Sequence, residues 1–423
     1  MSAIGNTVSE DNTLLVIGYV WPEPNSSAAG SHMQSLLELF LDRGWQVTFA
    51  SPAAKSAHGL CLESLGIASA EIELNNASFD EFLVELNPGV VLFDRFMMEE
   101  QFGWRVEEHC PQALRILDTE DLFCLRHARH DHFKQHQQIN PILTPQLLFT
   151  EMAQREIAAI YRCDLSLVIS EFELAVLTER FGVDPALLVY CPFMLEPVTS
   201  AQQQQLPSFE QRQHFIAIGN FRHPPNWDAV LFMQQQLWPR IRQQLPSVEL
   251  HIYGAYPPPK ATALHNVRQG FLVKGWADDA KAVMQQARVN LAPVRFGAGL
   301  KGKLVDAMAC GTPSVTTSIG AEGLAGELPF GGAISDNLEE LVAAAVALYQ
   351  QADQWRVMQA AGFASHNQRF DRQQHEQRIY QRLEHCLEHL DAHRLNNFNG
   401  AMLRHHQHKS TKYMAQWIAE KNK

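Results

Sequence analysis

A glycine-rich segment late in the chain, residues 290–324, has the sequence NLAPVRFGAGLKGKLVDAMACGTPSVTTSIGAEGL. Gly297 and Gly299 carry no Cβ, so the backbone there can approach a ligand closely. We expect a helix to begin directly after them, and the first turn of a helix offers unpaired N–H groups and a positive dipole end to an anion. Lys301 and Lys303 add two cations. The spacing favours a diphosphate site, and the alternative is a tight strand-to-helix turn with solvated lysines.

Three acidic side chains follow an expected strand at residues 114–117, namely Asp118, Glu120 and Asp121. Carboxylates at the carboxyl end of a parallel strand face the crevice where ligands bind, and there they can accept a proton from a hydroxyl group. We therefore treat all three as catalytic candidates, with Glu120 or Asp121 as the group that orients or deprotonates a substrate. The alternative for Asp118 is to cap the helix that follows.

The histidines of the segment 127–136, His127, His130, His132 and His136, are spaced along an expected helix. They are surrounded by Arg and Gln, and no cysteine lies at the spacing of a zinc ligand, so we interpret them as a solvated helix face. The chain also has no Asp-x-Asp triplet at a strand end. The sequence therefore predicts no metal site.

Two series of alternating strands and helices must position these groups. Strands are expected at 14–20, 47–50, 90–93, 114–117 and 165–169 in the first series, and at 215–219, 250–253, 272–273, 289–292, 314–317 and 333–334 in the second. Strands that alternate with helices pair in parallel and build doubly wound α/β domains. The fold we expect is two Rossmann-like domains facing each other across a cleft.

The domain boundaries follow from where this alternation stops. We expect an N-terminal domain over 1–195, a Gln- and Pro-rich linker over 196–213, a C-terminal domain over 214–369, and closing helices over 370–423 that return to the N-terminal domain. In the second domain, Asn226 is expected to cap a helix. No Gly-x-Gly-x-x-Gly follows the first strand, which disfavours a nucleotide-dependent dehydrogenase.

Charge and composition limit the partners and the location. With a formal net charge of −12 and no long Lys/Arg block, we expect no nucleic-acid partner. Residues 1–12 lack the pattern of a signal peptide, and the seven cysteines form no CxxC pair, which favours a cytoplasmic protein. The last thirty residues carry six cations, and the alternatives for them are a solvated closing helix or peripheral contact with the inner face of the membrane. These cations are Arg394, Arg404, Lys409, Lys412, Lys421 and Lys423.

The segment 305–315, VDAMACGTPSV, resembles the donor-site signature of the GT-B glycosyltransferases of the group 1 or family 4-like type. In that family an acidic residue precedes Ala-Met-Ala-x-Gly-x-Pro and binds the ribose of a nucleotide, and Asp306 occupies this position. The chain departs from the family at three points. Ala298 stands where many members have a glutamate, Asn220 stands where many have an arginine, and Asn226 lies near the place of a lysine. We expect Arg222, together with the two lysines, to replace the missing charge.

The resemblance spans most of the chain and implies the remaining site residues. It implies a donor site made of Gly219, Asn220, Arg222, Gly254, Gly275, Trp276, Gly297, Gly299, Leu300, Lys301, Lys303 and Asp306. It also places Gly30, Ser31 and His32 on the acceptor side, at the start of the first helix.

The resemblance further implies transfer of a sugar from a nucleotide-sugar donor to a glycan, lipid-linked or small-molecule acceptor, in cell-surface polysaccharide or glycoconjugate synthesis. The reaction is expected to be metal-independent and retaining rather than inverting. The nucleotide-sugar is a co-substrate, so no cofactor is expected. Two alternatives stay open: a GT-B epimerase, and a catalytically silent nucleotide-sugar-binding module.

Overall fold

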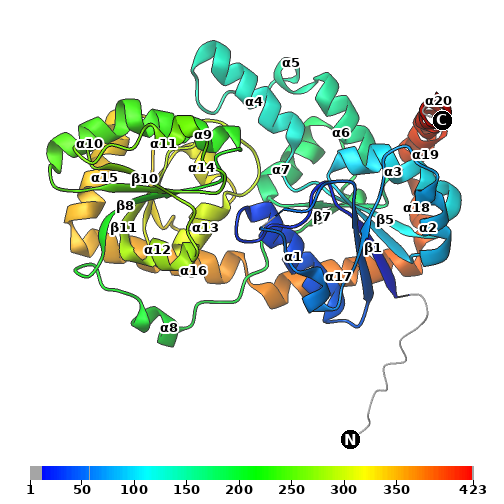
Figure 1. The fold of residues 1–423 in the computed structure, drawn as a ribbon, viewed down its shortest axis with the longest axis horizontal. Coiled ribbons are helices and arrows are strands. Elements are labelled where there is room, and N and C mark those ends of the chain that lie inside the picture. The colour runs from blue at the N-terminus through cyan, green and yellow to red at the C-terminus, as the bar shows by residue number, and fades with distance from the viewer. Residues whose placement is uncertain (1–11, 57, 422–423) are drawn as a thin grey trace, which may run out of the picture.

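The computed structural model describes residues 12–56 and 58–421 as two α/β domains (Figure 1). The expectations for residues 1–11 and for Lys423 therefore lie outside the described residues. Each domain is built on one parallel sheet covered by helices on both faces, which confirms the expected doubly wound fold.

The first sheet has the strand order β3-β2-β1-β4-β5-β6-β7, and all pairs are parallel. Within the described residues its strands are β1 (Thr13–Ile17), β2 (Gln46–Ser51), β3 (Ala68–Glu71), β4 (Val90–Asp94), β5 (Leu114–Asp118), β6 (Leu165–Val168) and β7 (Leu188–Tyr190). Every residue of β4, β5 and β6 is buried, as expected for strands covered on both faces.

Helices cover both faces of this sheet. They are α1 (Ala28–Leu41), α2 (Ser78–Leu86), α3 (Phe96–His109), α4 (Phe123–His136), α5 (Pro145–Leu148), α6 (Glu151–Arg162) and α7 (Glu171–Ala175). Alternate residues of β1 divide between two cores. Leu15 and Ile17 pack with α2, α3, α4 and α6, whereas Leu14 and Val16 pack with α1 on the other face.

The second sheet has the order β10-β9-β8-β11-β12-β13, again all parallel. Its strands in the described chain are β8 (Gln213–Ile218), β9 (Leu250–Tyr253), β10 (Phe271–Gly275), β11 (Ala287–Ala292), β12 (Ser314–Thr316) and β13 (Gly332–Ile334). The helices from this half are α8 (Ser200–Gln205), α9 (Pro224–Phe232), α10 (Trp238–Gln244), α11 (Pro259–Thr262), α12 (Ala280–Gln286), α13 (Gly302–Ala309), α14 (Ser318–Ala321), α15 (Leu338–Gln350) and α16 (Ala352–Arg369).

Two helix-capping expectations are wrong. Asn226 does not cap α9, because the helix begins at Pro224 with His223 as its N-cap, and proline is preferred at a first helical position. Asp118 does not cap α4, which begins at Phe123. The N–H groups of Phe123 and Cys124 instead donate to the carboxylate of Glu156 on α6, at 2.9 and 2.8 Å.

The chain crosses between the domains twice, and the two crossings lie side by side. The N–H of Leu195 donates to Phe370 O at 2.8 Å, and the N–H of Arg372 donates to Leu195 O at 3.0 Å. After the second crossing, α17 (Arg372–Glu388) packs Ile379 and Leu383 into the α1 face of the first domain. The chain then continues through α18 (Leu390–Asn396), α19 (Phe398–Leu403), the π-helical turn η5 (Arg404–His408) and α20 (Lys409–Lys421).

Three of the six cations in this last segment pair with acids of the first domain. Arg394 pairs with Asp164, Arg404 with Glu107 and Lys412 with Glu108. Large apolar side chains nevertheless face solvent there, at Phe398, Met402, Tyr413, Met414 and Trp417. No described helix has the length and apolar character that crossing a bilayer requires.

Candidate functional site

The loops at the carboxyl edges of both sheets meet between the domains. In the second sheet the strand order changes direction between β8 and β11, and ligands of doubly wound sheets bind at such a point. The loops after these two strands are 219–223 and 293–301. In the first sheet the change lies between β1 and β4, with β5 beside it, so the acidic segment 118–121 faces the same cleft.

Lys303 lies at the centre of the loops of the second domain. Its amine donates to Asn226 Oδ1 at 2.5 Å, and the Asn226 amide donates to Asn220 O at 3.0 Å. A Cβ on Gly219 would come within 2.8 Å of Lys303 Nζ and 2.7 Å of Asn226 Nδ2. Gly219 therefore leaves the space that the lysine amine occupies. Burial lowers the pKa of Lys303 to about 8, with a further contribution from the Lys301 charge.

The glycine loop ahead of α13 is held in a fixed shape. The helix begins at Gly302, two residues after the expected start at Leu300, so Lys303 belongs to its first turn. Lys301 is buried, and its amine donates to Gly299 O at 2.7 Å. Gly299 has φ +65, a left-handed value that favours glycine. The first N–H groups of a helix have no partner within it, so the start of α13 offers the positive end of a dipole beside Lys301 and Lys303.

Side chains of the first domain form hydrogen bonds to this loop from the other side of the cleft. The carboxylate of Glu173 on α7 accepts from Gly299 N at 2.8 Å and from Leu122 N at 3.0 Å. Arg129 on α4 donates to Gly297 O at 3.0 Å and pairs with both oxygens of Glu322 at 2.8 and 2.7 Å. Burial, and next the Asp121 charge, raises the pKa of Glu173 to about 8.

Ala298, at the place of the family's first glutamate, packs against the apolar core of the first domain. A carboxylate at this position would be buried against apolar side chains of the first domain, which is unfavourable. An alanine in place of the family's glutamate is therefore consistent with the contact between the two domains here.

A second set of contacts joins the domains at the edge of the cleft. Trp276 stacks on His58 with ring centroids 4.2 Å apart, and the Tyr256 hydroxyl donates to Glu23 Oε1 at 2.9 Å. The Arg222 guanidinium lies over the Tyr256 ring at 3.6 Å. The structure thus places Arg222 against the Tyr256 ring at the edge of the cleft.

Two more of the expected donor residues, Asp306 and Gly254, lie on or next to elements of the second domain. Asp306 lies on α13, one turn after Lys303, and is exposed to solvent. Protein atoms nevertheless surround its carboxyl group, and this desolvation raises the pKa to about 6. Gly254 follows β9, where a Cβ would come within 2.0 Å of Gly219 O. Only glycine therefore permits this approach of the β8 and β9 loops.

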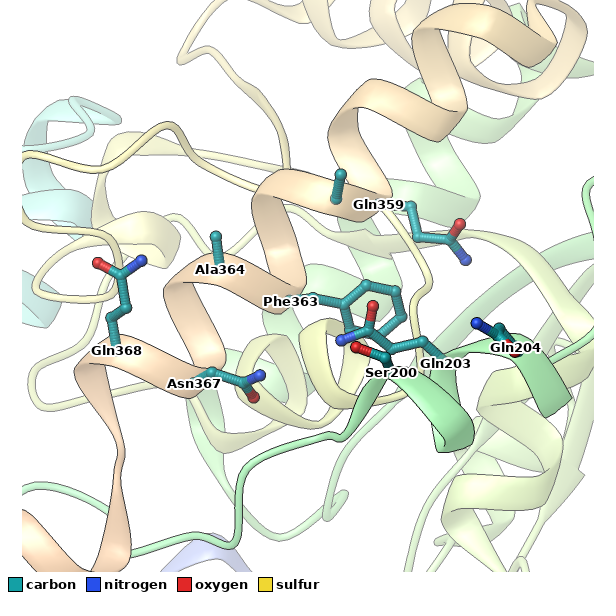
Figure 2. A pocket seen from close by; sticks show the side chains of 9 residues that line it. Ser200, Gln203, Gln204, Gln359, Phe363, Ala364, Asn367 and Gln368 are labelled. Carbon is teal, nitrogen blue, oxygen red and sulfur yellow. The ribbon is translucent and has the colours of Figure 1, made fainter.

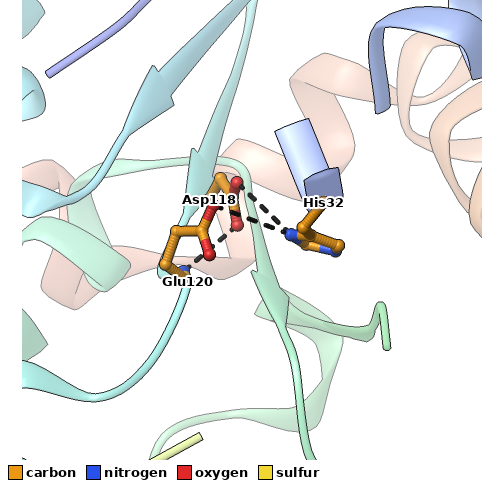
Figure 3. Close-up of side chains that lie close together, drawn as sticks. All are labelled: His32, Asp118 and Glu120. Atoms are coloured by element: carbon orange, nitrogen blue, oxygen red, sulfur yellow. Dashed lines mark hydrogen bonds and ion pairs between the residues drawn. The ribbon is translucent and has the colours of Figure 1, made fainter. Parts of the chain in front are cut away.

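The three acidic candidates divide into two groups. Asp121 lies against the glycine loop, since a Cβ on Gly299 would come within 2.7 Å of Asp121 Cβ. Both of its oxygens accept from Arg126, at 2.8 and 2.7 Å. Asp118 and Glu120 instead lie beside His32, whose Nδ1 is 3.9 Å from Asp118 Oδ2 and 3.8 Å from Glu120 Oε1 (Figure 3).

The three expected acceptor residues at the start of α1 lie in two different environments. His32 joins the buried acidic pair. Ser31 donates to Pro24 O at 2.8 Å, and a Cβ on Gly30 would come within 2.4 Å of the Glu23 backbone. In this structure Gly30 and Ser31 therefore shape the loop after β1.

Several residues of the cleft were not singled out from the sequence. Burial, and next the Arg126 charge, lowers the pKa of His223 to about 4, so its ring is neutral beside Asp121 and the lysines. The other additions are Arg126, which pairs with Asp121 five residues away, and the pair Arg129 and Glu322, whose contacts join segments more than 160 residues apart along the chain. No local motif signals such contacts.

An open hollow of about 530 Å³ lies elsewhere, between α8 and α16 (Figure 2). Its lining includes Gln203, Gln359, Phe363 and Asn367, and no charged side chain contributes. Without a cation it offers nothing to neutralise a diphosphate, so the loops between the domains remain the candidate site.

The fold and this site define a GT-B protein. The sucrose-phosphate synthase of Thermosynechococcus elongatus matches with a TM-score of 0.63 and 14% identity, over 89% of this chain and 99% of the other. HepE of Anabaena, in complex with UDP and glucose, matches with a TM-score of 0.64 and 14% identity, over 88% and 99%. WaaG, a glycosyltransferase involved in lipopolysaccharide biosynthesis, matches with a TM-score of 0.56 and 12% identity, over 84% and 95%.

The sequence of the second domain matches one known family. Residues 212–351 match the model of the family Glycosyl transferases group 1. No curated protein sequence matches the chain. The second domain thus matches the group 1 glycosyltransferases, the solved structures share the two-domain fold, and the resemblance seen at residues 305–315 is confirmed.

Proposed function

We propose that the protein transfers a sugar from a nucleoside-diphosphate sugar to a hydroxyl group of a second substrate. The observation that carries this proposal is that the Lys303 amine, which Asn226 fixes in the space beside Gly219, lies at the start of α13 with the charge of Lys301 nearby. A helix start with two lysines suits a diphosphate. The family match over residues 212–351 and the UDP bound to HepE support the same ligand class.

At the donor, the group to stabilise is the departing nucleoside diphosphate, because negative charge develops on it as the glycosidic bond breaks. We assign the stabilisation of that charge to the Lys303 amine and the first N–H groups of α13. To the Asp306 carboxylate, one helical turn further on, we assign hydrogen bonds from the two ribose hydroxyls. We propose that fixed cations and the helix dipole neutralise the diphosphate without a metal ion bound to it.

At the acceptor, a group must orient the incoming hydroxyl and receive its proton. Asp121 is the carboxylate of the 118–121 segment that touches the glycine loop, and Arg126 fixes the orientation of both its oxygens. We assign it the orienting role, with neutral His223 beside it. The family resemblance supports a retaining outcome, and the anomeric configuration of the product by proton NMR tests that outcome.

A screen of nucleoside diphosphates and their sugars by thermal shift tests the donor class, because a ligand that binds only the folded state raises Tm. One nucleotide series should raise Tm, and incubating its sugar conjugate with candidate acceptors should yield a glycoside and free nucleoside diphosphate. If no nucleotide of any base shifts Tm, the donor assignment is wrong.

The same experiment separates two other activities that this fold could support. A nucleotide-sugar epimerase would return an epimerised sugar-nucleotide, or release the free epimerised sugar, with no acceptor present. A silent binding module would show the thermal shift and no product with any acceptor. The altered position at Ala298 is the feature that keeps these alternatives open.

For the acceptor, we propose a glycan, a lipid-linked or a small-molecule hydroxyl compound of cell-surface polysaccharide or glycoconjugate synthesis, used on the cytoplasmic side. Seven free cysteines support a reducing compartment. On α20, Tyr413 and Trp417 are exposed one turn apart, with Lys421 over the Trp417 ring. Such a face supports peripheral contact with an anionic bilayer. Co-sedimentation with phosphatidylglycerol vesicles tests it, with Trp417→Ser and Tyr413→Ser expected to weaken binding.

A further inference from the structure

Three buried ligand-type atoms from separate positions of the first domain converge on one point (Figure 3). His32 lies on α1, Asp118 ends β5 and Glu120 lies in the loop that follows. Their side chains offer one imidazole nitrogen and two carboxylate oxygens within 4.8 Å of one another, and the residues are 1%, 1% and 7% exposed. We infer that these three side chains form a binding site for a divalent transition-metal ion of the zinc or manganese type.

The spacing of these atoms distinguishes a metal ion from a shared proton. His32 Nδ1 lies 3.9 Å from Asp118 Oδ2 and 3.8 Å from Glu120 Oε1, whereas a hydrogen bond requires about 2.7–3.2 Å. Within the described part of the chain, Nδ1 and Oδ2 are both buried without a hydrogen-bond partner. With the two oxygens 3.9 and 3.8 Å from Nδ1 and all three atoms within 4.8 Å of one another, a point equidistant from them lies within about 2.5 Å of each, near the length of a zinc–nitrogen or zinc–oxygen bond.

Neighbouring groups orient two of the ligands toward that point. On the far side of the ring, His32 Nε2 lies 3.5 Å from the buried Cys191 Sγ. When Nε2–H donates to this sulfur, the lone pair of Nδ1 faces the two carboxylates, and a contact of this type commonly fixes a metal-bound histidine. Asp118 is held in the same way, because its Oδ1 accepts from Glu120 N at 3.1 Å and leaves Oδ2 to face the ring.

The local charge and backbone also favour a cation. Asp94 is a third buried carboxylate, opposite Asp118 on the neighbouring strand, and the Arg95 guanidinium lies 3.5 Å from it. Glu120 has φ 57, a left-handed conformation that is unfavourable for a residue with a Cβ and needs support from its surroundings. One nitrogen and two oxygens form a ligand set that suits zinc, manganese or cobalt better than calcium.

This assignment does not depend on sugar transfer, and it is compatible with a metal-free diphosphate site. The donor loops belong to the second domain, whereas all three ligands belong to the first. A bound ion would fix the 118–121 loop and thereby the position of Asp121. Metal binding and nucleotide binding can therefore fail independently of each other.

The test is a metal titration of the full-length protein after treatment with a chelator and dialysis. Calorimetric titration with ZnCl2 and with MnCl2 should show about one equivalent bound, and Tm should rise with the bound ion. His32→Gln and Asp118→Asn should each weaken binding at least tenfold. Asp121→Asn removes a neighbouring acid of the same loop that is no ligand, so it should bind the ion as the wild type does.

The assignment is overturned if the folded wild type binds neither ion, or if both ligand variants bind as tightly as the wild type. Because a buried substitution can prevent folding, a second measurement uses the wild type alone. A crystal soaked in ZnCl2 should show an anomalous peak between His32, Asp118 and Glu120. A peak elsewhere, with none between these three, contradicts the assignment.

Discussion

Replacing Lys303 with methionine removes the cation nearest the proposed diphosphate and keeps most of the volume of the side chain. In the structure this amine is fixed by Asn226 Oδ1 at 2.5 Å, in the space that Gly219 leaves free. The variant should fold, because Lys303 forms no ion pair with the described residues. Its nucleotide binding should weaken.

The size of the effect follows from the type of contact that is lost. A hydrogen bond to a charged group contributes about 1.5–3 kcal/mol, which corresponds to a roughly 10- to 150-fold weaker Kd. The effect should also depend on pH. Burial lowers the pKa of Lys303 to about 8, so the amine is mostly protonated at pH 7 and loses its proton as the pH rises through 8. Wild-type affinity should therefore fall between pH 7 and 9, and K303M should lack this fall.

Isothermal titration with the nucleoside diphosphate that shifts the wild-type Tm most provides the Kd values. Lys412→Met is the matched control, because it removes the same charge on α20, where Lys412 pairs with Glu108. If K303M binds with the wild-type Kd, or if its pH dependence equals that of the wild type, the reasoning about this lysine is wrong.

Three further outcomes follow from the cleft. Asp121→Asn should lower kcat by about 10²- to 10⁴-fold with little change in nucleotide Kd, because the group acts on the acceptor hydroxyl; a normal kcat in steady-state assays contradicts this role. Arg129→Met leaves the Glu322 carboxylate without its partner and should cost about 3–5 kcal/mol in the free energy of unfolding; adding Glu322→Met should recover part of that loss in urea titrations, and no recovery would exclude the pairing argument. Burial, and next the Asp121 charge, raises the pKa of Glu173 from its usual value near 4.5 to about 8. Between these two pH values the folded state therefore binds more protons than the unfolded chain. Wild-type stability should fall as the pH rises from about 4.5 to 8, and Glu173→Gln should show a smaller fall when Tm is measured across this range; equal slopes would refute the assignment.

Periodicity and the signature motif suffice to predict the fold and the family match of the second domain. Continuous apolar runs such as residues 90–93 identify strands buried on both faces, and residues 305–315 lie within the segment that matches the group 1 glycosyltransferases. The strands β3 and β7 were missed because ASAE and LVY are short and show no clear alternation. Short edge strands of this kind are set by pairing with a neighbour more than by their own sequence.

The contacts between the domains could not be predicted from one sequence. The carboxylate of Glu173 reaches Gly299, 126 residues further along the chain, and Arg129 reaches Glu322, 193 residues away. Only the closed arrangement of the two domains brings such pairs together. The capping error at Asn226 has a local cause, since the prolines at 224 and 225 start the helix earlier and free the amide to hold Lys303.

The central claim is that the loops around Gly219 and Gly297–Lys303 bind a nucleoside diphosphate. A crystal structure of the protein with the nucleoside diphosphate that gives the largest thermal shift tests it most directly. We predict that the phosphates lie at the start of α13 within hydrogen-bond distance of Lys303 Nζ, and that the ribose contacts Asp306. A ligand bound outside these loops, with the Lys303–Asn226 contact unchanged, would contradict the account.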